Sequence, residues 1–383
     1  MKRIYLDNAA TTPLSPTVLK AMMPYLTTNF GNASSIYQEG QIASAAINNS
    51  KKTVAQFLNC EPKEVTFTGS ASESNNIVLF GIVNAYFKNN PKVKPHIITS
   101  IIEHPAILNT CKELERQEVE VTYIPVNSDG IVDIKFLEKS IKKNTILISI
   151  MYANNEIGTI QPIEKISQII KKYKKNNIYP LFHTDAVQAT NYLNCDISKL
   201  NVDLLTLSGH KIYGPKGIGA LYVKEGTPIK PFIFGGGQEK LRSGTENIAG
   251  IVGLGKAVEE IFKNQKQVKK ISILRDYLLN QILKTIPNSQ LNGSKDQRLP
   301  HNINFSYPGQ INGKQLVLML DQKGISVSTG SACHTKSPNP SHVLKAIGLS
   351  DDLAFNSLRI TLSHNTTQKE MKYVSKSILA SLM

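Results

Sequence analysis

Short apolar runs that end in polar residues recur between Val65 and Leu207, and this repeat constrains the fold more than any other feature. Helix-like segments separate the runs. Such alternation is typical of an α/β domain with a mostly parallel sheet. Ligand-binding side chains are then expected where the strands end. The runs are Val65–Thr68, His96–Ser100, Glu120–Pro125, Thr145–Met151, Tyr179–Asp185 and Val202–Leu207.

Lys211 closely follows the last of these runs, in the stretch Ser208-Gly-His-Lys. Lysine is normally solvated, so a lysine at the end of a buried strand is unusual. Partial desolvation and nearby positive charge help a lysine amine to lose its proton and become nucleophilic. The neighbouring Ser208 and His210 are able to form hydrogen bonds to an anion. The combination indicates a Schiff base to pyridoxal phosphate. A surface lysine after a strand is the alternative.

Asp185 closes the preceding run. A buried carboxylate at this point would keep the pyridine nitrogen of such a cofactor protonated. By itself, an aspartate at a strand end is usually structural. The pair formed by Lys211 and Asp185 is much more specific than either residue alone.

Two other strand ends carry candidate cofactor contacts. Gly69–Asn76 joins an apolar strand to an apolar helix, which is a geometry that binds phosphate or simply caps the helix. His104 stands between a strand and the proline-started helix that follows it. It is placed to stack over a flat ring, with a structural histidine as the alternative.

Cys333 lies in the loop Ser328–Pro340, among small and hydroxyl residues. This composition is unlike a packed core, so we expect an exposed thiol whose thiolate fraction is raised by nearby basic residues. The four cysteines are far apart, which argues against a disulfide scaffold and a structural zinc site. Small hydrophobic roles are expected for Cys60, Cys111 and Cys195.

Arg359 lies on the expected strand Leu358–Ser363, which also carries hydroxyl residues. A guanidinium group binds a carboxylate through two parallel hydrogen bonds. The sequence therefore makes Arg359 a candidate for a substrate carboxylate, with a salt bridge on a domain surface as the alternative.

The length of 383 residues predicts two domains. A net charge of +15 would fit nucleic-acid binding, but the lysines are scattered along helices without interleaved aromatic residues. We therefore favour solvated basic faces. No run is long enough to span a membrane, and the N-terminus has no apolar signal segment, so a cytoplasmic protein is expected.

Seven motifs together resemble the NifS/IscS-like cysteine desulfurases, which are class V, fold type I pyridoxal phosphate enzymes. The resemblance covers nearly the whole chain and implies a mostly parallel seven-stranded sheet plus a smaller α+β domain. We expect the large domain at residues 15–255 and the small domain at residues 1–14 and 256–383. Helices are expected at Ile248–Phe262 and Val268–Thr285. The motifs are Tyr5–Pro13, Glu103–Ile107, Asn154–Pro162, His183–Gln188, Ser208–Gly217, Arg242–Asn247 and Gly330–Cys333.

The resemblance also implies roles for individual residues. Lys211 binds the cofactor, Asp185 pairs with its pyridine nitrogen, and His104 stacks on its ring. Cys333 accepts the sulfur atom, while Arg359 and Asn155 hold the substrate carboxylate. The remaining cofactor contacts are Ala71, Ser72, Asn155, Gln188, Ser208 and His210, with Thr245 supplied by the second subunit of a homodimer.

The implied reaction converts L-cysteine to L-alanine and leaves a persulfide on Cys333 for an acceptor protein. Iron–sulfur cluster assembly and tRNA thiolation are the expected destinations, through a cluster scaffold or a sulfurtransferase. The alternatives are a selenocysteine lyase, another class V enzyme such as an aminotransferase, and a cofactor-free sulfur-trafficking scaffold. No bound metal, membrane or direct nucleic-acid contact is expected.

Overall fold

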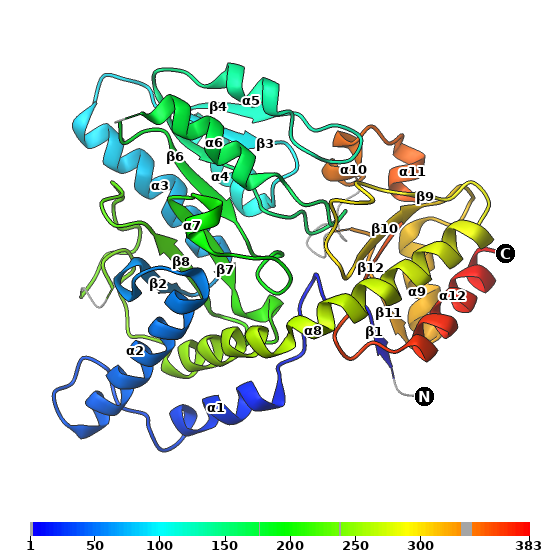
Figure 1. The fold of residues 1–383 in the computed structure, drawn as a ribbon, viewed down its shortest axis with the longest axis horizontal. Helices are drawn as coiled ribbons and strands as arrows, with labels where there is room; N and C mark the ends of the chain where they lie inside the picture. The colour runs from blue at the N-terminus through cyan, green and yellow to red at the C-terminus, as the bar shows by residue number, and fades with distance from the viewer. Residues whose placement is uncertain (1–2, 176, 237–238, 331–338) are drawn as a thin grey trace.

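The computed structural model describes residues 3–175, 177–236, 239–330 and 339–383, and its larger sheet has seven strands. Their order is β2-β8-β7-β6-β5-β3-β4 (Figure 1), and β8 runs antiparallel to both of its neighbours. The mostly parallel α/β sheet predicted from the apolar runs is confirmed. The strands are β2 (Val65–Thr68), β3 (His96–Ser100), β4 (Glu120–Ile124), β5 (Thr145–Ser149), β6 (Leu181–Asp185), β7 (Leu204–Ser208) and β8 (Gly219–Val223).

Helices cover both faces of this sheet (Figure 1), so every residue of its central strands β5, β6 and β7 is buried. Neighbouring residues of a strand point to opposite faces. Ile97 and Leu147 pack with α3 and α4, whereas Ile98 and Ile148 belong to the core that includes α2, α6 and α8. The helices of this part are α1 (Pro16–Leu26), α2 (Gln38–Leu58), α3 (Ala71–Asn89), α4 (Pro105–Arg116), α5 (Ile134–Ser140), α6 (Ile163–Lys174) and α7 (Ile197–Leu200), with the 3-10 turns η1 (Pro62–Glu64) and η2 (Gly209–Lys211).

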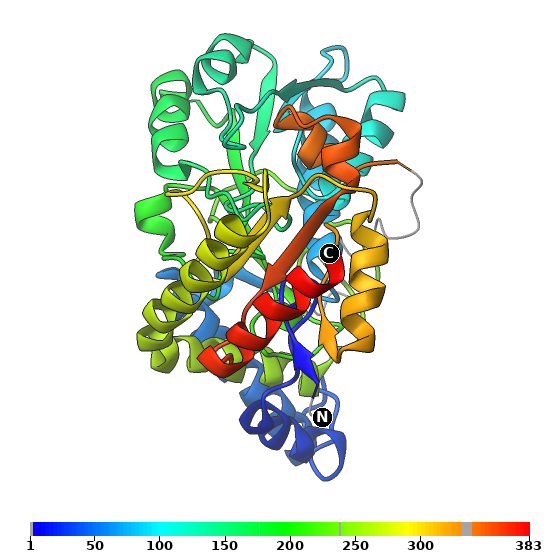
Figure 2. The same ribbon diagram turned by 90° about the vertical axis from the view of Figure 1, so that its right-hand side faces the viewer.

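The C-terminal part of the chain contains two smaller sheets with a core of their own. Strands β12, β10 and β9 are antiparallel, and β1 pairs in parallel with β11. Figure 2 shows the N-terminal strand among these C-terminal elements. The elements are β1 (Ile4–Tyr5), β9 (Gln290–Leu291), β10 (Asn302–Ser306), β11 (Ile325–Ser326), β12 (Ser357–Thr361), α9 (Gly313–Gln322), α10 (His342–Ala346), α11 (Asp351–Phe355) and α12 (Gln368–Leu382).

One helix, α8 (Ile248–Thr285), runs from the large sheet to the C-terminal part. It contacts α1, α2 and α12. The prediction of two separate helices over this stretch is wrong, because residues 256–285 contain no glycine or proline to interrupt the backbone hydrogen bonds. The predicted domain boundary within this helix stays a prediction. None of the helices in the described ranges has the length and apolar character needed to cross a bilayer.

Candidate active site

A cavity of about 250 Å³ lies where several strands of the large sheet end. Side chains from the ends of β6 and β7 line it, together with the start of α3 and the segment after β5. This is the edge at which the sequence predicts a ligand site. The predicted site residues that line it are Ala71, Ser72, His104, Asn155, Asp185, Gln188, Ser208, His210, Lys211 and Arg359.

Lys211 ends the single turn η2, which follows directly on strand β7. Its Nζ atom donates hydrogen bonds to the carbonyl oxygens of Ala9 and Ala10, each at 2.6 Å. The N-terminal segment therefore forms one wall of the cavity and holds the amine in place. Gly209 permits the tight turn, since a Cβ atom there would lie 2.9 Å from the carbonyl oxygen of Pro215.

Asp185 is the last residue of β6 and is 7% exposed. Its Oδ2 atom accepts a hydrogen bond from Asn75 Nδ2 at 2.8 Å, and its Oδ1 atom accepts one from the backbone N–H of Val187 at 3.0 Å. Within the described residues no ion pair reaches this carboxylate. A fixed, buried carboxylate of this kind suits a cationic ring nitrogen.

Two buried titratable groups near Asp185 are held uncharged. Burial lowers the pKa of His183 to about 3, and its ring nitrogens lie 2.8 Å from Ser149 Oγ and 3.1 Å from Thr206 Oγ1. Burial, with a smaller contribution from the charge of Asp185, raises the pKa of Glu103 to about 8. Glu103 therefore keeps its proton at neutral pH.

The rim near α3 offers donors suited to a phosphate. Ser70 caps the helix by accepting a hydrogen bond from the backbone N–H of Glu73, and the first-turn N–H groups of a helix have no intrahelical partner. Ser70 can therefore cap α3 while other N–H groups of its first turn bind a phosphate, so both interpretations of this segment are compatible. Across the cavity, burial and then the charges of Lys211 and Lys216 lower the pKa of His210 to about 4, so this imidazole is neutral.

His104 combines a structural position with a place in the cavity wall. Its Nδ1 atom accepts a hydrogen bond from the backbone N–H of Ala106 at 3.1 Å, which caps helix α4. Since Nδ1 accepts, the proton of the neutral ring resides on Nε2. His104 therefore has the structural role proposed as its alternative, because it caps α4. Its ring also lines the cavity.

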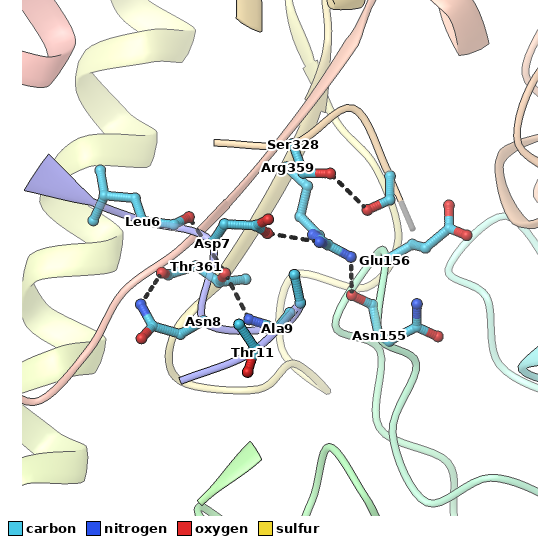
Figure 3. Close-up of polar contacts among 12 residues, drawn as sticks. Leu6, Asp7, Asn8, Ala9, Thr11, Asn155, Glu156, Ser328, Arg359 and Thr361 are labelled. Carbon is cyan, nitrogen blue, oxygen red and sulfur yellow. Dashed lines mark hydrogen bonds and ion pairs between the residues drawn. The ribbon is translucent and has the colours of Figure 1, made fainter. Parts of the chain in front are cut away.

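Arg359 lies on β12 with only 1% of its side chain exposed. Its Nη2 atom is 2.7 Å from Asp7 Oδ1, and its Nη1 atom donates to the backbone carbonyl of Asn155 at 3.0 Å (Figure 3). A salt bridge on the domain surface, the alternative for this residue, is wrong because the guanidinium is buried. Through these two contacts, Arg359 connects the C-terminal strand β12 to the N-terminal segment and to the loop after β5.

Two predicted site residues are not among those that line this cavity in the described part of the chain, and the prediction assigns one of them, Thr245, to the second subunit. Thr245 is exposed and does not line this cavity. Cys333 lies outside the described residues, although the flanking Ser341 donates a hydrogen bond to Glu156 Oε2 at 2.5 Å, next to Asn155. Burial raises the pKa of the other three thiols to about 12, as expected for small hydrophobic residues: Cys60, Cys111 and Cys195.

Sequence reasoning missed the residues that hold these groups in position. Asn75 was detectable, because it lies three and four residues after Ser72 and Ala71 and so shares their helix face. Asp7, Ala9 and Ala10 belong to the motif Tyr5–Pro13, which carries the family resemblance without indicating what its individual residues contact. Their exact partners, Arg359 and Lys211, have no local signal.

Residues 4–374 match the family model described as aminotransferase class-V. The chain is 50% identical over 378 residues to a cysteine desulfurase IscS of Methanosarcina thermophila, covering 97% of this chain and 90% of the relative. It is 47% identical over 376 residues to a cysteine desulfurase IscS of Dictyoglomus turgidum, covering 97% and 93%.

Solved structures give the same result. A NifS-like protein superimposes with a TM-score of 0.91 at 37% identity, covering 99% of this chain and 98% of its own. A structure titled SspA in complex with cysteine has a TM-score of 0.82 at 37% identity, covering 95% and 100%. With both comparisons extending over nearly the full length, the chain belongs to the aminotransferase class-V family, as one of its NifS/IscS-like cysteine desulfurases.

Proposed function

We propose that the protein takes the sulfur atom from L-cysteine with pyridoxal phosphate as its cofactor, producing L-alanine and a persulfide on Cys333. The observation that carries the proposal is that Lys211, Asp185 and Arg359 line one cavity. The relatives named cysteine desulfurase support the reaction, and the similar structure titled as a cysteine complex supports the substrate.

The residues around the cavity fit pyridoxal phosphate in each of its chemical parts. Lys211 supplies the amine, Asp185 supplies a carboxylate that forms no ion pair within the described residues, and His104 supplies a flat ring. Hydroxyl and imidazole donors for the phosphate come from Ser72, Ser208 and His210. When bound, the cofactor supplies an electron sink for the pair of electrons released at the substrate Cα atom.

The protein's own groups would bind the substrate and move its protons. Arg359 and the side chain of Asn155 take the α-carboxylate, which orients the amino acid in the cavity. Lys211 Nζ, held near the N-terminal wall, takes the Cα proton as a base and returns it later. The Nε2–H of His104 is a second proton donor at the cavity wall.

The sulfur step balances without an external oxidant. The thiolate of Cys333 forms an S–S bond with the substrate sulfur while the carbon–sulfur bond breaks. The electron pair of the broken bond stays with carbon, which takes up a proton and becomes the methyl group of alanine. The enzyme is left with a persulfide, and an acceptor protein is required to remove it. The IscS names of the relatives favour an iron–sulfur scaffold or a sulfurtransferase as this acceptor.

We also infer a homodimer in the cytoplasm. Free Cys60, Cys111 and Cys195 fit a reducing compartment. Large apolar side chains are exposed from the end of α1 to the start of α2, and also on the loop that carries Thr245. The Lys51–Glu239 ion pair at 2.7 Å connects this loop to α2. Exposed apolar groups of this kind favour a protein interface. Within these two segments the most exposed are Leu26, Phe30, Ile36, Tyr37 and Phe234.

A mixed-dimer experiment tests whether Thr245 acts on the neighbouring subunit. Lys211→Ala removes the amine, and Thr245→Asp places a negative charge against the phosphate. If the loop acts across the dimer, coexpression of the two variants gives one site with both changes and one intact site, so activity returns. Absence of recovered activity, or a fully active monomer, contradicts the proposal.

The reaction itself is tested by product analysis. The purified protein should carry bound cofactor and convert L-cysteine to equal amounts of alanine and sulfane sulfur. A strong preference for L-selenocysteine would favour the lyase alternative, and alanine formation only with a keto acid acceptor would favour an aminotransferase. A colourless protein without either activity would support the scaffold alternative.

A further inference from the structure

The buried guanidinium of Arg359 has one countercharge within the described residues, the carboxylate of Asp7. The carboxylate of Glu156, on the nearby loop, accepts a hydrogen bond from Ser341 instead. The Nε atom of Arg359 is buried and has no hydrogen-bond partner among the described residues. Each terminal nitrogen of Arg359 already donates one hydrogen bond, Nη2 to Asp7 and Nη1 to the carbonyl of Asn155, and the remaining N–H groups are left for a ligand.

Asp7 is fixed behind the cavity rather than in its wall. It is absent from the cavity lining, and its side chain is 16% exposed. Its backbone carbonyl accepts hydrogen bonds from Tyr5 Oη and from the N–H of Ala10, both at 3.0 Å. The residue is also paired with Thr361 of β12. These contacts hold the carboxylate at a constant position relative to Arg359.

This arrangement has two opposite effects on a second carboxylate that binds Arg359. The hydrogen bond from Nη2 to Asp7 orients the guanidinium and reduces its freedom before the ligand arrives. The negative charge of Asp7, however, offsets the positive field of Arg359 and repels the incoming carboxylate, and both effects are strong in a buried site. The side chain therefore favours the correct geometry and disfavours very tight binding.

We propose that Asp7 is a positioning residue that limits the affinity of Arg359 for the α-carboxylate shared by substrate and product. The inference rests on the proposed assignment of Arg359 to that carboxylate. L-alanine keeps the carboxylate that L-cysteine used to bind, so a site without this restraint would release its product slowly. Asp7 keeps the guanidinium oriented and allows the product to leave.

Two substitutions separate orientation from charge. Asp7→Asn retains an oxygen that accepts the hydrogen bond from Nη2 but removes the charge, whereas Asp7→Ala removes both. We expect L-alanine to bind the Asp7→Asn holoenzyme more tightly, on the order of tenfold, in a calorimetric or spectral titration. The KM for cysteine and kcat should fall together in this variant. Asp7→Ala should bind L-alanine more weakly than Asp7→Asn does.

The control ligand is L-alaninol, which lacks the carboxylate and whose affinity should not change in Asp7→Asn. Unchanged or weaker L-alanine binding in Asp7→Asn overturns the inference. Equal gains for L-alanine and L-alaninol also overturn it, since they would indicate a general change of the cavity. Arg359→Lys distinguishes the underlying assignment: if it leaves L-alanine binding unchanged, the proposed role of Arg359 fails. If it weakens binding but Asp7→Asn shows no gain, only the inference about Asp7 fails.

Discussion

The Nδ2 atom of Asn75 lies 2.8 Å from the Oδ2 atom of Asp185, and both residues are buried. Asn75 lies near the start of helix α3, whereas Asp185 is the last residue of strand β6. The contact joins the helix proposed to bind the phosphate to the carboxylate proposed to hold the ring nitrogen. One amide thus sets the relative position of two parts of the cofactor site.

Replacing Asn75 by alanine should therefore weaken cofactor retention. Asp185 would keep the N–H of Val187 but lose its other donor, and a hydrogen bond to a charged group contributes about 1.5–3 kcal/mol. We expect the cofactor dissociation constant to rise by about tenfold or more, measured by dialysis and absorbance. Asn76→Ala is the matched control, because the Asn76 side chain bonds the Ser72 carbonyl instead. If Asn75→Ala and Asn76→Ala retain the cofactor equally well, the contact between Asn75 and Asp185 does not contribute to cofactor binding.

Lys211 should be the residue that binds the cofactor covalently. Its amine is held on two carbonyl oxygens inside the cavity, while Lys216, five residues on, is exposed. Borohydride reduction followed by peptide mapping should find the label on Lys211. Lys211→Ala should lose the label and all activity, whereas Lys216→Ala should keep both. Label on Lys216 would refute the assignment.

Cys333→Ser should separate substrate binding from sulfur transfer. The serine hydroxyl is a far weaker nucleophile than a thiolate, so persulfide formation should be lost. Cofactor absorbance and its change on adding cysteine should remain, because the binding residues are elsewhere. Cys60→Ser is the control, since burial raises the pKa of Cys60 to about 12 and leaves it protonated. Normal alanine production by Cys333→Ser would end the proposed role of Cys333.

Glu103 should make the protein less stable as the pH rises. Burial raises its pKa from 4.5 to about 8, so between these values the folded protein holds a proton that the unfolded chain has released. The free energy of unfolding then falls with rising pH in this window. The melting temperature of the parent protein should therefore fall relative to that of Glu103→Gln when the pH is raised from 5 to 8.

The control for this pH effect is Glu113→Gln. A hydrogen bond from Arg116 lowers the pKa of this exposed carboxyl, so its contribution to stability is lost as the pH falls. Its removal should not give the trend expected for Glu103→Gln. A pH-independent difference between Glu103→Gln and the parent protein would show that Glu103 is ionised in the folded state.

The sequence alone determined the layered α/β fold and most of the residues around the cavity. A strand buried on both faces must be mostly apolar along its length, so β5 and β7 stand out in the amino-acid sequence as apolar runs. The polar residue after each run marks the edge of the sheet that binds ligands. Lys211 and Asp185 were predictable for this local reason.

Only the tertiary structure decided which distant groups meet. Asp7 and Arg359 are 352 residues apart, and Lys211 and Ala9 are 202 residues apart. No local periodicity encodes such pairs, because they depend on β1 crossing to β11 and on the continuous helix α8 that connects the two parts. Local patterns specify helices and strands through burial and backbone hydrogen bonding. The ion pair behind the cavity forms only when separately encoded segments pack together.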